Sequence, residues 1–139
     1  MNISRTALAI ATCLTLAGPV SAHEGHEADE NVVPNFSQSI PNIPGKSVVA
    51  VEVYYPPGGH SAPHRHADSA FIYAYVVSGS IRSQVEGQPI RVYKAGESFA
   101  EEPGAHHLLG ANASSTEPAK LLAVFVVDSD DEKLTTPDK

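Results

Sequence analysis

Short runs of β-branched and aromatic residues, separated by Gly and Pro, dominate the chain from residue 47 onwards. The runs occupy residues 48–55, 70–77, 80–85, 89–93, 107–109 and 120–127. Within residues 80–85 apolar and polar positions alternate, as expected of a strand with one buried and one solvated face. No segment of ten or more residues shows helical spacing. Strands that recur at short intervals between turn residues are typical of an all-β sandwich or barrel.

The barrel is predicted to occupy residues 47–127. Strands in a segment of this length are expected to close into a small double-sheet jelly roll with a pocket between the sheets. Residues 23–46 are polar and acidic, are punctuated by Pro34 and Pro41 and show no periodicity, so we expect a flexible N-terminal arm. Residues 128–139 are acidic and contain proline, and we expect a solvated tail.

The N-terminal segment, residues 1–22, combines one positive charge, an apolar run and small residues up to Ala22. This pattern predicts a secretory signal peptide that is cleaved after Ala22. Gly18 and Pro19 interrupt the apolar run before it reaches the roughly 18 residues that a membrane span needs. We therefore expect an exported protein, periplasmic or secreted, with no membrane span after cleavage. Cleavage would also remove Cys13, the sole cysteine, and leave no thiol for a disulfide or a metal.

The length and net charge of the chain limit the number of domains and the classes of binding partner that we expect. The 139 residues include 9 Lys plus Arg against 16 Asp plus Glu, with a net charge of −7. One modest domain is the expected size. The scattered bases form no stripe that could neutralise phosphates, so nucleic acid is not an expected partner. A small-molecule ligand or substrate is the expected one.

Two histidines two residues apart carry the first chemical signal. On a strand His64 and His66 would share one face while Arg65 points away. Converging neutral imidazoles suit zinc, copper, iron and nickel. An isolated pair of this kind is more often found in an exposed loop. His60, in a Gly-Pro loop, is expected to be a loop residue rather than a ligand.

The surroundings of these histidines follow two spaced motifs. The first consists of Gly58, His64, His66 and Gly79, and the second of Gly96, Gly104 and His107. Over residues 47–127 this resembles the cupin superfamily, whose fold is a double-stranded β-helix, the jelly-roll or cupin barrel. The resemblance implies one divalent transition metal (Fe, Mn, Ni, Cu or Zn) held by His64, His66 and His107. His106 is the alternative to His107.

One family residue is missing. The glutamate that usually completes the first motif falls on residues 70–72, most closely on Ile72, which cannot bind a metal. The acids nearest the second motif are Glu97, Glu101 and Glu102, and one of them could supply the missing ligand or a general base. For Glu97 and Glu101 we expect a solvated turn instead.

Further candidates for chemistry are weaker. Arg82, Gln84 and Glu102 are candidate catalytic residues. Arg82 and Gln84 share one face of a predicted strand, and these two could equally form the solvated face of an edge strand. After cleavage the chain would begin at His23, whose free amine and imidazole, together with His26, could chelate copper.

The resemblance implies three hypotheses on function. The first is an exported mononuclear metal-binding cupin that acts as a metal-dependent dioxygenase or other oxidoreductase on a small enolisable or phenolic compound. The alternative is a non-catalytic cupin that binds a metal or small ligand, as a sensor or carrier. The third is a metal-free assembly module, since cupin folds often dimerise through sheet faces, and a homodimer is therefore a possible state.

Overall fold

Strands form the regular structure of residues 29–139, the part of the chain that this computed structural model describes. The predicted signal peptide, residues 1–22, lies outside the described residues. In chain order the strands are β1 (Asn31–Ser39), β2 (Lys46–Tyr55), β3 (His60–Ser61), β4 (His64–His66), β5 (Phe71–Ser78), β6 (Ser80–Val85), β7 (Arg91–Lys94), β8 (Ser98–Glu101), β9 (His106–Asn112), β10 (Ala119–Asp128) and β11 (Thr135–Pro137). Within this part of the chain no helix has the length and apolar character to cross a membrane.

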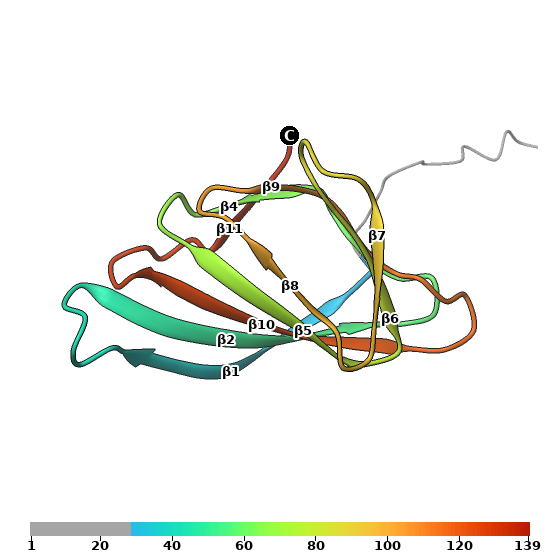
Figure 1. The fold of residues 1–139 in the computed structure, drawn as a ribbon, viewed down its shortest axis with the longest axis horizontal. Helices are drawn as coiled ribbons and strands as arrows, with labels where there is room; N and C mark the ends of the chain where they lie inside the picture. Colours follow the sequence, from blue (N-terminus) through green and yellow to red (C-terminus); the bar gives the residue numbers. More distant parts are fainter. Residues whose placement is uncertain (1–28) are drawn as a thin grey trace, which may run out of the picture.

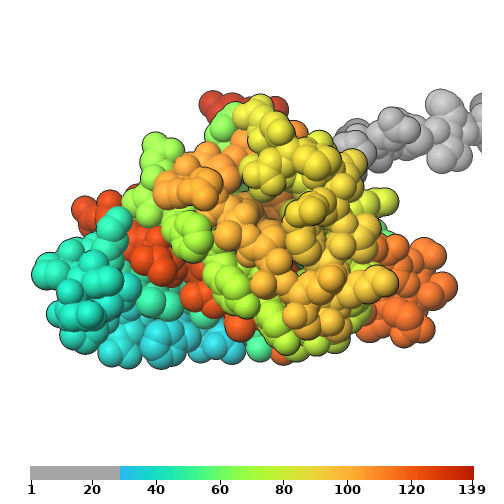
Figure 2. Space-filling model, viewed as in Figure 1, coloured from blue at the N-terminus to red at the C-terminus, as the bar shows by residue number. Residues whose placement is uncertain are grey.

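Two antiparallel sheets enclose a common interior (Figure 1). The first has the strand order β1-β2-β10-β5-β8, and the second β11-β4-β9-β6-β7 with β3 also paired to β9. Strands distant in sequence, such as β2 and β10, lie side by side, as a doubly wound jelly roll requires. The yellow and orange segments, from β6 to β9, form much of the face seen in Figure 2. The prediction of an all-β jelly roll is confirmed.

The core follows the two-residue period of the strands. In β10 every second side chain is buried, and the inward set comprises Ala119, Leu121, Ala123, Phe125 and Val127. Inward residues of β2 and β5 pack against them from the neighbouring strands. Burial of each large apolar side chain contributes roughly 1.5–3 kcal/mol.

Gly79 turns the chain from the first sheet into the second, between β5 and β6. Its φ of +70° is a backbone conformation that side-chain-bearing residues rarely adopt. A Cβ atom at this position would also lie 2.6 Å from the carbonyl oxygen of Pro118. Gly79, the last residue of the first motif, is therefore required both by the turn and by the close approach of the loop before β10.

The predicted flexible arm is wrong for residues 31–39, which form the edge strand β1. This strand pairs with β2 along its length, with a register shift between Pro34 and Phe36. Proline is tolerated at an edge or a bulge because no ladder hydrogen bond is required of it there. Every β1 residue is exposed, so the strand shows no buried face and its sequence no period. Backbone pairing orders it, and residues 23–28 lie outside the described part.

The predicted solvated tail is also wrong in part. The strand β10 continues to Asp128, and Thr135–Pro137 form β11, which pairs with β4. Leu134 packs against the buried cluster that contains Phe125. The C-terminal segment thus covers the free edge of the strand that carries His64 and His66.

Candidate functional site

Three imidazoles meet in the interior of the barrel. His64 and His66 lie on β4, and the intervening Arg65 is exposed, as the alternation of a strand predicts. The register of β4 and β9 pairs His64 with His107. One nitrogen from each of the three imidazoles lies within 4.8 Å of the others, among the residues that the structure describes. The structure therefore brings together the three histidines that the cupin resemblance implies.

The register also separates His107 from His106. Because His106 pairs with Arg65, its side chain lies on the outer face of the sheet. There its Nε2 lies 2.8 Å from an oxygen of Asp138, and its Nδ1 lies 3.0 Å from a guanidinium nitrogen of Arg65. His106 is therefore not part of the cluster. His60 lies in the short strand β3 rather than in a loop, and it too is outside the cluster.

Two of the imidazoles are oriented by fixed partners. Nδ1 of His64 lies 2.8 Å from the carbonyl oxygen of Ala62, which can only accept, so Nδ1 carries the proton and Nε2 has the free lone pair. Nε2 of His107 lies 3.0 Å from the Ser83 hydroxyl oxygen. Such partners fix the ring orientation of metal-binding histidines.

Glu101 is the unforeseen member of the site. It is 4 % exposed at the end of β8. Its Oε2 lies 3.0 Å from Nε2 of His66, and its Oε1 lies 3.5 Å from Nδ1 of His107. The expectation of a solvated turn is therefore wrong for Glu101. It holds for Glu97, which is exposed and whose carboxylate accepts a hydrogen bond from the backbone N–H of Lys94.

A signal for Glu101 is present in the sequence. In the segment Ser98–Glu101, Phe99 and Glu101 alternate with Ser98 and Ala100, and the structure confirms that Ser98 and Ala100 are the exposed pair. A strand interpretation of these four residues would have placed Glu101 on the inward face beside Phe99. A preceding glycine turn and two adjacent acids favoured a loop instead.

The weaker catalytic candidates lie away from the cluster. Ile81 and Ser83 are the inward residues of β6, whereas Arg82 is exposed and Gln84 donates a hydrogen bond to the backbone carbonyl of Gln88. Arg82 and Gln84 thus lie on the solvated face, the alternative given above. Glu102 is exposed in the turn after β8. None of the three lines the pocket.

Burial sets the protonation states of the cluster. It lowers the pKa of His107 to about 4 and also lowers the pKa of His64. Burial by itself would raise the pKa of Glu101, but the contact with His66 and the other imidazoles outweighs it and holds that pKa below its ordinary value. At neutral pH His64 and His107 are therefore neutral and Glu101 is a carboxylate, which are the forms that bind metals.

Several buried polar atoms at this point lack a hydrogen-bond partner. They are both ring nitrogens of His66 and Oε2 of Glu101. Although His66 and Glu101 approach to 3.0 Å, these atoms do not meet in hydrogen-bonding geometry. Unsatisfied buried groups are costly in free energy. A cation bound between the imidazoles and the carboxylate would satisfy Glu101 Oε2 and one ring nitrogen of His66, so the donor set fits a transition metal.

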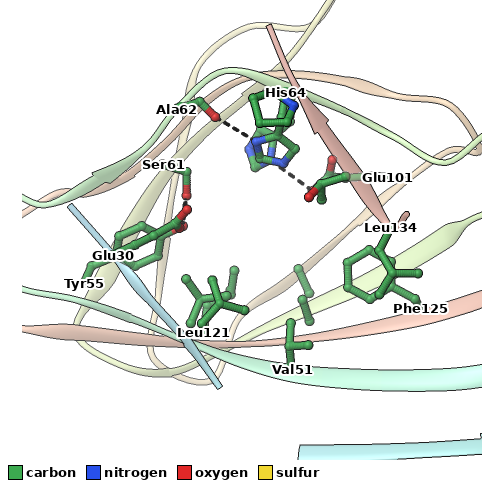
Figure 3. A pocket seen from close by; sticks show the side chains of 17 residues that line it. Glu30, Val51, Tyr55, Ser61, Ala62, His64, Glu101, Leu121, Phe125 and Leu134 are labelled. Atoms are coloured by element: carbon green, nitrogen blue, oxygen red, sulfur yellow. Dashed lines mark hydrogen bonds and ion pairs between the residues drawn. The ribbon is translucent and has the colours of Figure 1, made fainter. Parts of the chain in front are cut away.

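The cluster opens onto a cavity of about 310 Å³ (Figure 3). Its body is apolar and includes Val51, Leu121, Phe125 and Leu134. His64, His107 and Glu101 line part of it, and Glu30, Ser61 and Tyr55 form a second polar group on the side away from Glu101. A cavity of this volume, apolar with a few placed polar groups, is typical of a small-molecule site.

A closed double-stranded β-helix with convergent histidines in its interior defines a class of small β-barrel proteins that hold ligands inside the barrel. The chain belongs to the cupin family, since the cupin domain matches residues 51–125, more than half of the sequence. No curated protein matches the chain in sequence.

Solved structures show the same fold. A Klebsiella pneumoniae protein with a double-stranded β-helix domain is 18% identical with a TM-score of 0.62, over 80% of this chain and 85% of that one. An oxalate oxidase in complex with the substrate analogue glycolate is 25% identical with a TM-score of 0.57, over 85% of this chain and 59% of that one. The DMSP lyase DddQ from Ruegeria pomeroyi is 23% identical with a TM-score of 0.51, over 65% and 42%.

Proposed function

We propose that this cupin binds one divalent transition metal through His64, His66 and His107. The observation that carries the proposal is the pair of buried, unpartnered residues His66 and Glu101, which meet at the cluster of three imidazoles. Imidazole donors suit iron, nickel, copper and zinc, and a carboxylate in the same site adds manganese to the candidates.

We further propose that the site acts as a dioxygenase or other oxidoreductase on a small enolisable or phenolic compound. A bound metal would supply a Lewis acid that polarises a chelating substrate oxygen and, if it is redox-active, a route for electrons to O2. In dioxygenation both oxygen atoms enter the substrate, which supplies the electrons, so no external reductant is needed. The apolar wall of Val51, Leu121 and Phe125 would exclude water and hold the body of the substrate.

The relatives support this chemistry only in part. The oxalate oxidase shares a quarter of its aligned residues with this chain. Oxalate, however, is small and doubly anionic, whereas this cavity is about 310 Å³ and mostly apolar. A larger substrate with an apolar body fits the cavity better than a short dicarboxylate does.

Metal analysis of purified protein tests the proposal. We expect about one equivalent of metal in the wild type and in the His106→Gln variant, because His106 lies on the outer face. The double variant His64→Ala, His66→Ala should lose the metal. Equal metal content in all three proteins would contradict the site.

Oxygen uptake separates the two metal-binding hypotheses. Iron, manganese, nickel, copper and zinc forms would be assayed with diketones, catechols and flavonols. Turnover in a redox-active form supports the oxidoreductase. Metal retention without turnover in any form favours the non-catalytic sensor or carrier.

Export stays part of the proposal. Mass spectrometry of the mature protein should give an N-terminus at His23 if the segment up to Ala22 is a signal peptide. A different N-terminus would remove the proposed copper chelation by His23 and His26. A homodimer likewise remains a prediction.

A further inference from the structure

The cupin position for the glutamate ligand is occupied by an apolar side chain in this protein. Ile72 lies on β5 and is 1 % exposed, so it points into the core. It offers no lone pair to a metal. A three-histidine site would leave the full charge of a divalent metal without compensation from the protein.

The neighbouring strand supplies a carboxylate at the same level of the sheet. In the register of β5 and β8, Ile72 pairs directly with Glu101. Directly opposed residues of an antiparallel pair have Cβ atoms about 4.5–5.5 Å apart and project from the same face. Glu101 therefore enters the interior beside Ile72.

Among the described residues, both side-chain oxygens of Glu101 make their close contacts with imidazole nitrogens. Its two oxygens lie 3.0 Å from His66 Nε2 and 3.5 Å from His107 Nδ1. Oε2 and both ring nitrogens of His66 are buried without a hydrogen-bond partner. A buried carboxylate needs a cation or several hydrogen bonds to offset its lost hydration.

We propose that Glu101 is the fourth metal ligand, supplied from β8 in place of the glutamate that this family carries on β5. The inference rests on the proposed metal site. Glu101 would also reduce the net charge of the loaded site and so favour a neutral or singly anionic ligand over a dianion.

Titration with Co2+, followed by its visible absorption and by calorimetry, tests the ligand. Glu101→Gln keeps the shape of the side chain but removes the anion, and Glu102→Gln is the matched exposed control. We expect Glu101→Gln to weaken Co2+ binding by more than about 100-fold, beyond the roughly 10–100-fold loss typical of a residue that only orients a ligand, and to change the absorption bands. Glu102→Gln should match the wild type.

Exchanging the side chains of Ile72 and Glu101 gives a sharper test. The double variant Ile72→Glu, Glu101→Ile returns the carboxylate to β5, and it should bind Co2+ more tightly than Glu101→Gln does. Wild-type affinity and an unchanged spectrum in Glu101→Gln would overturn the inference while leaving the three-histidine site intact. Absence of Co2+ binding by the wild type would overturn the proposed function itself.

A second inference comes from the second polar group of the cavity, formed by Glu30, Ser61 and Tyr55. The hydroxyls of Tyr55 and Ser61 lie 2.7 Å apart, and Ser61 donates a hydrogen bond to the carboxylate of Glu30. Tyr55 is 3 % exposed and Ser61 is 7 % exposed. The backbone N–H of Asp29 donates to the carbonyl of His60, which anchors the segment that carries Glu30.

The direction of this chain of hydrogen bonds determines what remains free. The Glu30 carboxylate can only accept, so the single proton of Ser61 is committed to it. Tyr55 must then donate its own proton to Ser61. The lone pairs left on Glu30 and Tyr55 are all acceptors. Burial raises the pKa of Tyr55, which keeps this phenol protonated.

The two polar groups of the cavity are neighbours around Gly110 on β9. A Cβ atom at Gly110 would lie 3.3 Å from Cε1 of His107 and 3.4 Å from the hydroxyl oxygens of both Ser61 and Tyr55. The glycine therefore leaves open the space that joins the histidine cluster to the acceptors.

We infer that the ligand, held at the proposed metal site through an oxygen, carries a hydroxyl or amine that donates hydrogen bonds to Glu30 and Tyr55. A carboxylate at that end would meet only acceptors and a like charge. The substrate class is thus an apolar compound with a chelating oxygen at one end and a hydrogen-bond donor at the other.

Two catechols that differ only at the distal group provide the probe. Binding of 4-(hydroxymethyl)catechol and 3,4-dihydroxybenzoate to the Zn2+-loaded full chain would be compared by calorimetry. We expect the hydroxymethyl compound to bind about tenfold more tightly. Glu30→Gln should reduce this preference, and the exposed control Glu132→Gln should keep it.

The outcomes distinguish the two levels of the proposal. Equal binding of both catechols, binding of neither, or the same preference in Glu30→Gln would overturn the ligand class although zinc is retained. Failure of the wild type to retain zinc would instead overturn the metal site.

Discussion

At the scale of single residues, the site depends on inward and outward alternation. His107 and His106 are adjacent in sequence, yet one enters the barrel and the other contacts Asp138 on the outside. The same alternation places Ser83 inward, where its hydroxyl contacts Nε2 of His107, and Arg82 outward. Whether a residue lies at an odd or an even position along its strand therefore decides whether its side chain faces the site or the outside.

Replacing Ser83 by Ala should loosen the site without unfolding the barrel. The hydroxyl holds the His107 ring, and loss of such a partner weakens metal binding about tenfold or more. Zinc titration against a competing chelator measures the affinity, with Ser80→Ala as the control on the same strand. Unchanged affinity in Ser83→Ala would show that packing alone orients His107.

At the scale of elements, the six runs of the sequence predicted β2, β5, β6, β7, β9 and β10, whereas β3, β8 and the edge strands β1 and β11 were not predicted. Alternate side chains are buried along part of β5 and β6 and along the whole of β10. In contrast, β1 and β11 are exposed at every residue, so no hydrophobic period marks them. Backbone pairing with β2 and β4 orders them, and that information resides in the partner strands.

The candidate site likewise has residues that the sequence predicted and one that it did not. The motifs led to His64, His66 and His107, because glycine turns and histidine spacing are local features of the sequence. Glu101 was missed because its burial depends on the register of β8 against β5, which brings it opposite Ile72. The alternation of Phe99 and Glu101 indicates only that Glu101 faces inward, whereas its position opposite Ile72 has no signature in the spacing of residues.

Removal of residues 134–139 should destabilise the barrel at the histidine strand. The deletion removes the packing of Leu134, the hydrogen bond from Ala67 N–H to its carbonyl, and the pairing of β11 with β4. Loss of a fully buried Leu side chain costs about 2–5 kcal/mol, and the half-buried Leu134 should contribute less than this. We expect a lower melting temperature and faster loss of zinc to a chelator.

Leu134→Ala separates packing from strand pairing in this segment, and Asp130→Asn, in the exposed turn after β10, is the control. An intermediate melting temperature for Leu134→Ala is expected. A truncated chain as stable as the wild type would mean that β11 contributes nothing to the barrel.

At the scale of the whole molecule, metal binding and folding should be linked. The imidazoles and carboxylate converge only in the folded barrel, so a metal that binds there stabilises the native state by mass action. Treatment with EDTA should lower the melting temperature of the wild type by several degrees. The His64→Ala, His66→Ala variant, which should hold no metal, is expected to melt at the same temperature with and without EDTA.

Acid should destabilise the metal-free protein through its buried imidazoles. Burial lowers the pKa of His107 from 6.5 to about 4, so between these values the unfolded chain binds a proton that the native state does not. Stability therefore rises with pH across this window and is lost as the pH falls, by about 2 kcal/mol at pH 5 from His107 alone. The lowered pKa values of His64 and Glu101 act in the same direction. Urea unfolding of EDTA-treated protein between pH 7.5 and pH 5 measures the slope, which His107→Gln should flatten and His106→Gln should keep. A flat profile in the wild type would mean that the buried imidazoles accept protons in the native state as readily as in the unfolded chain.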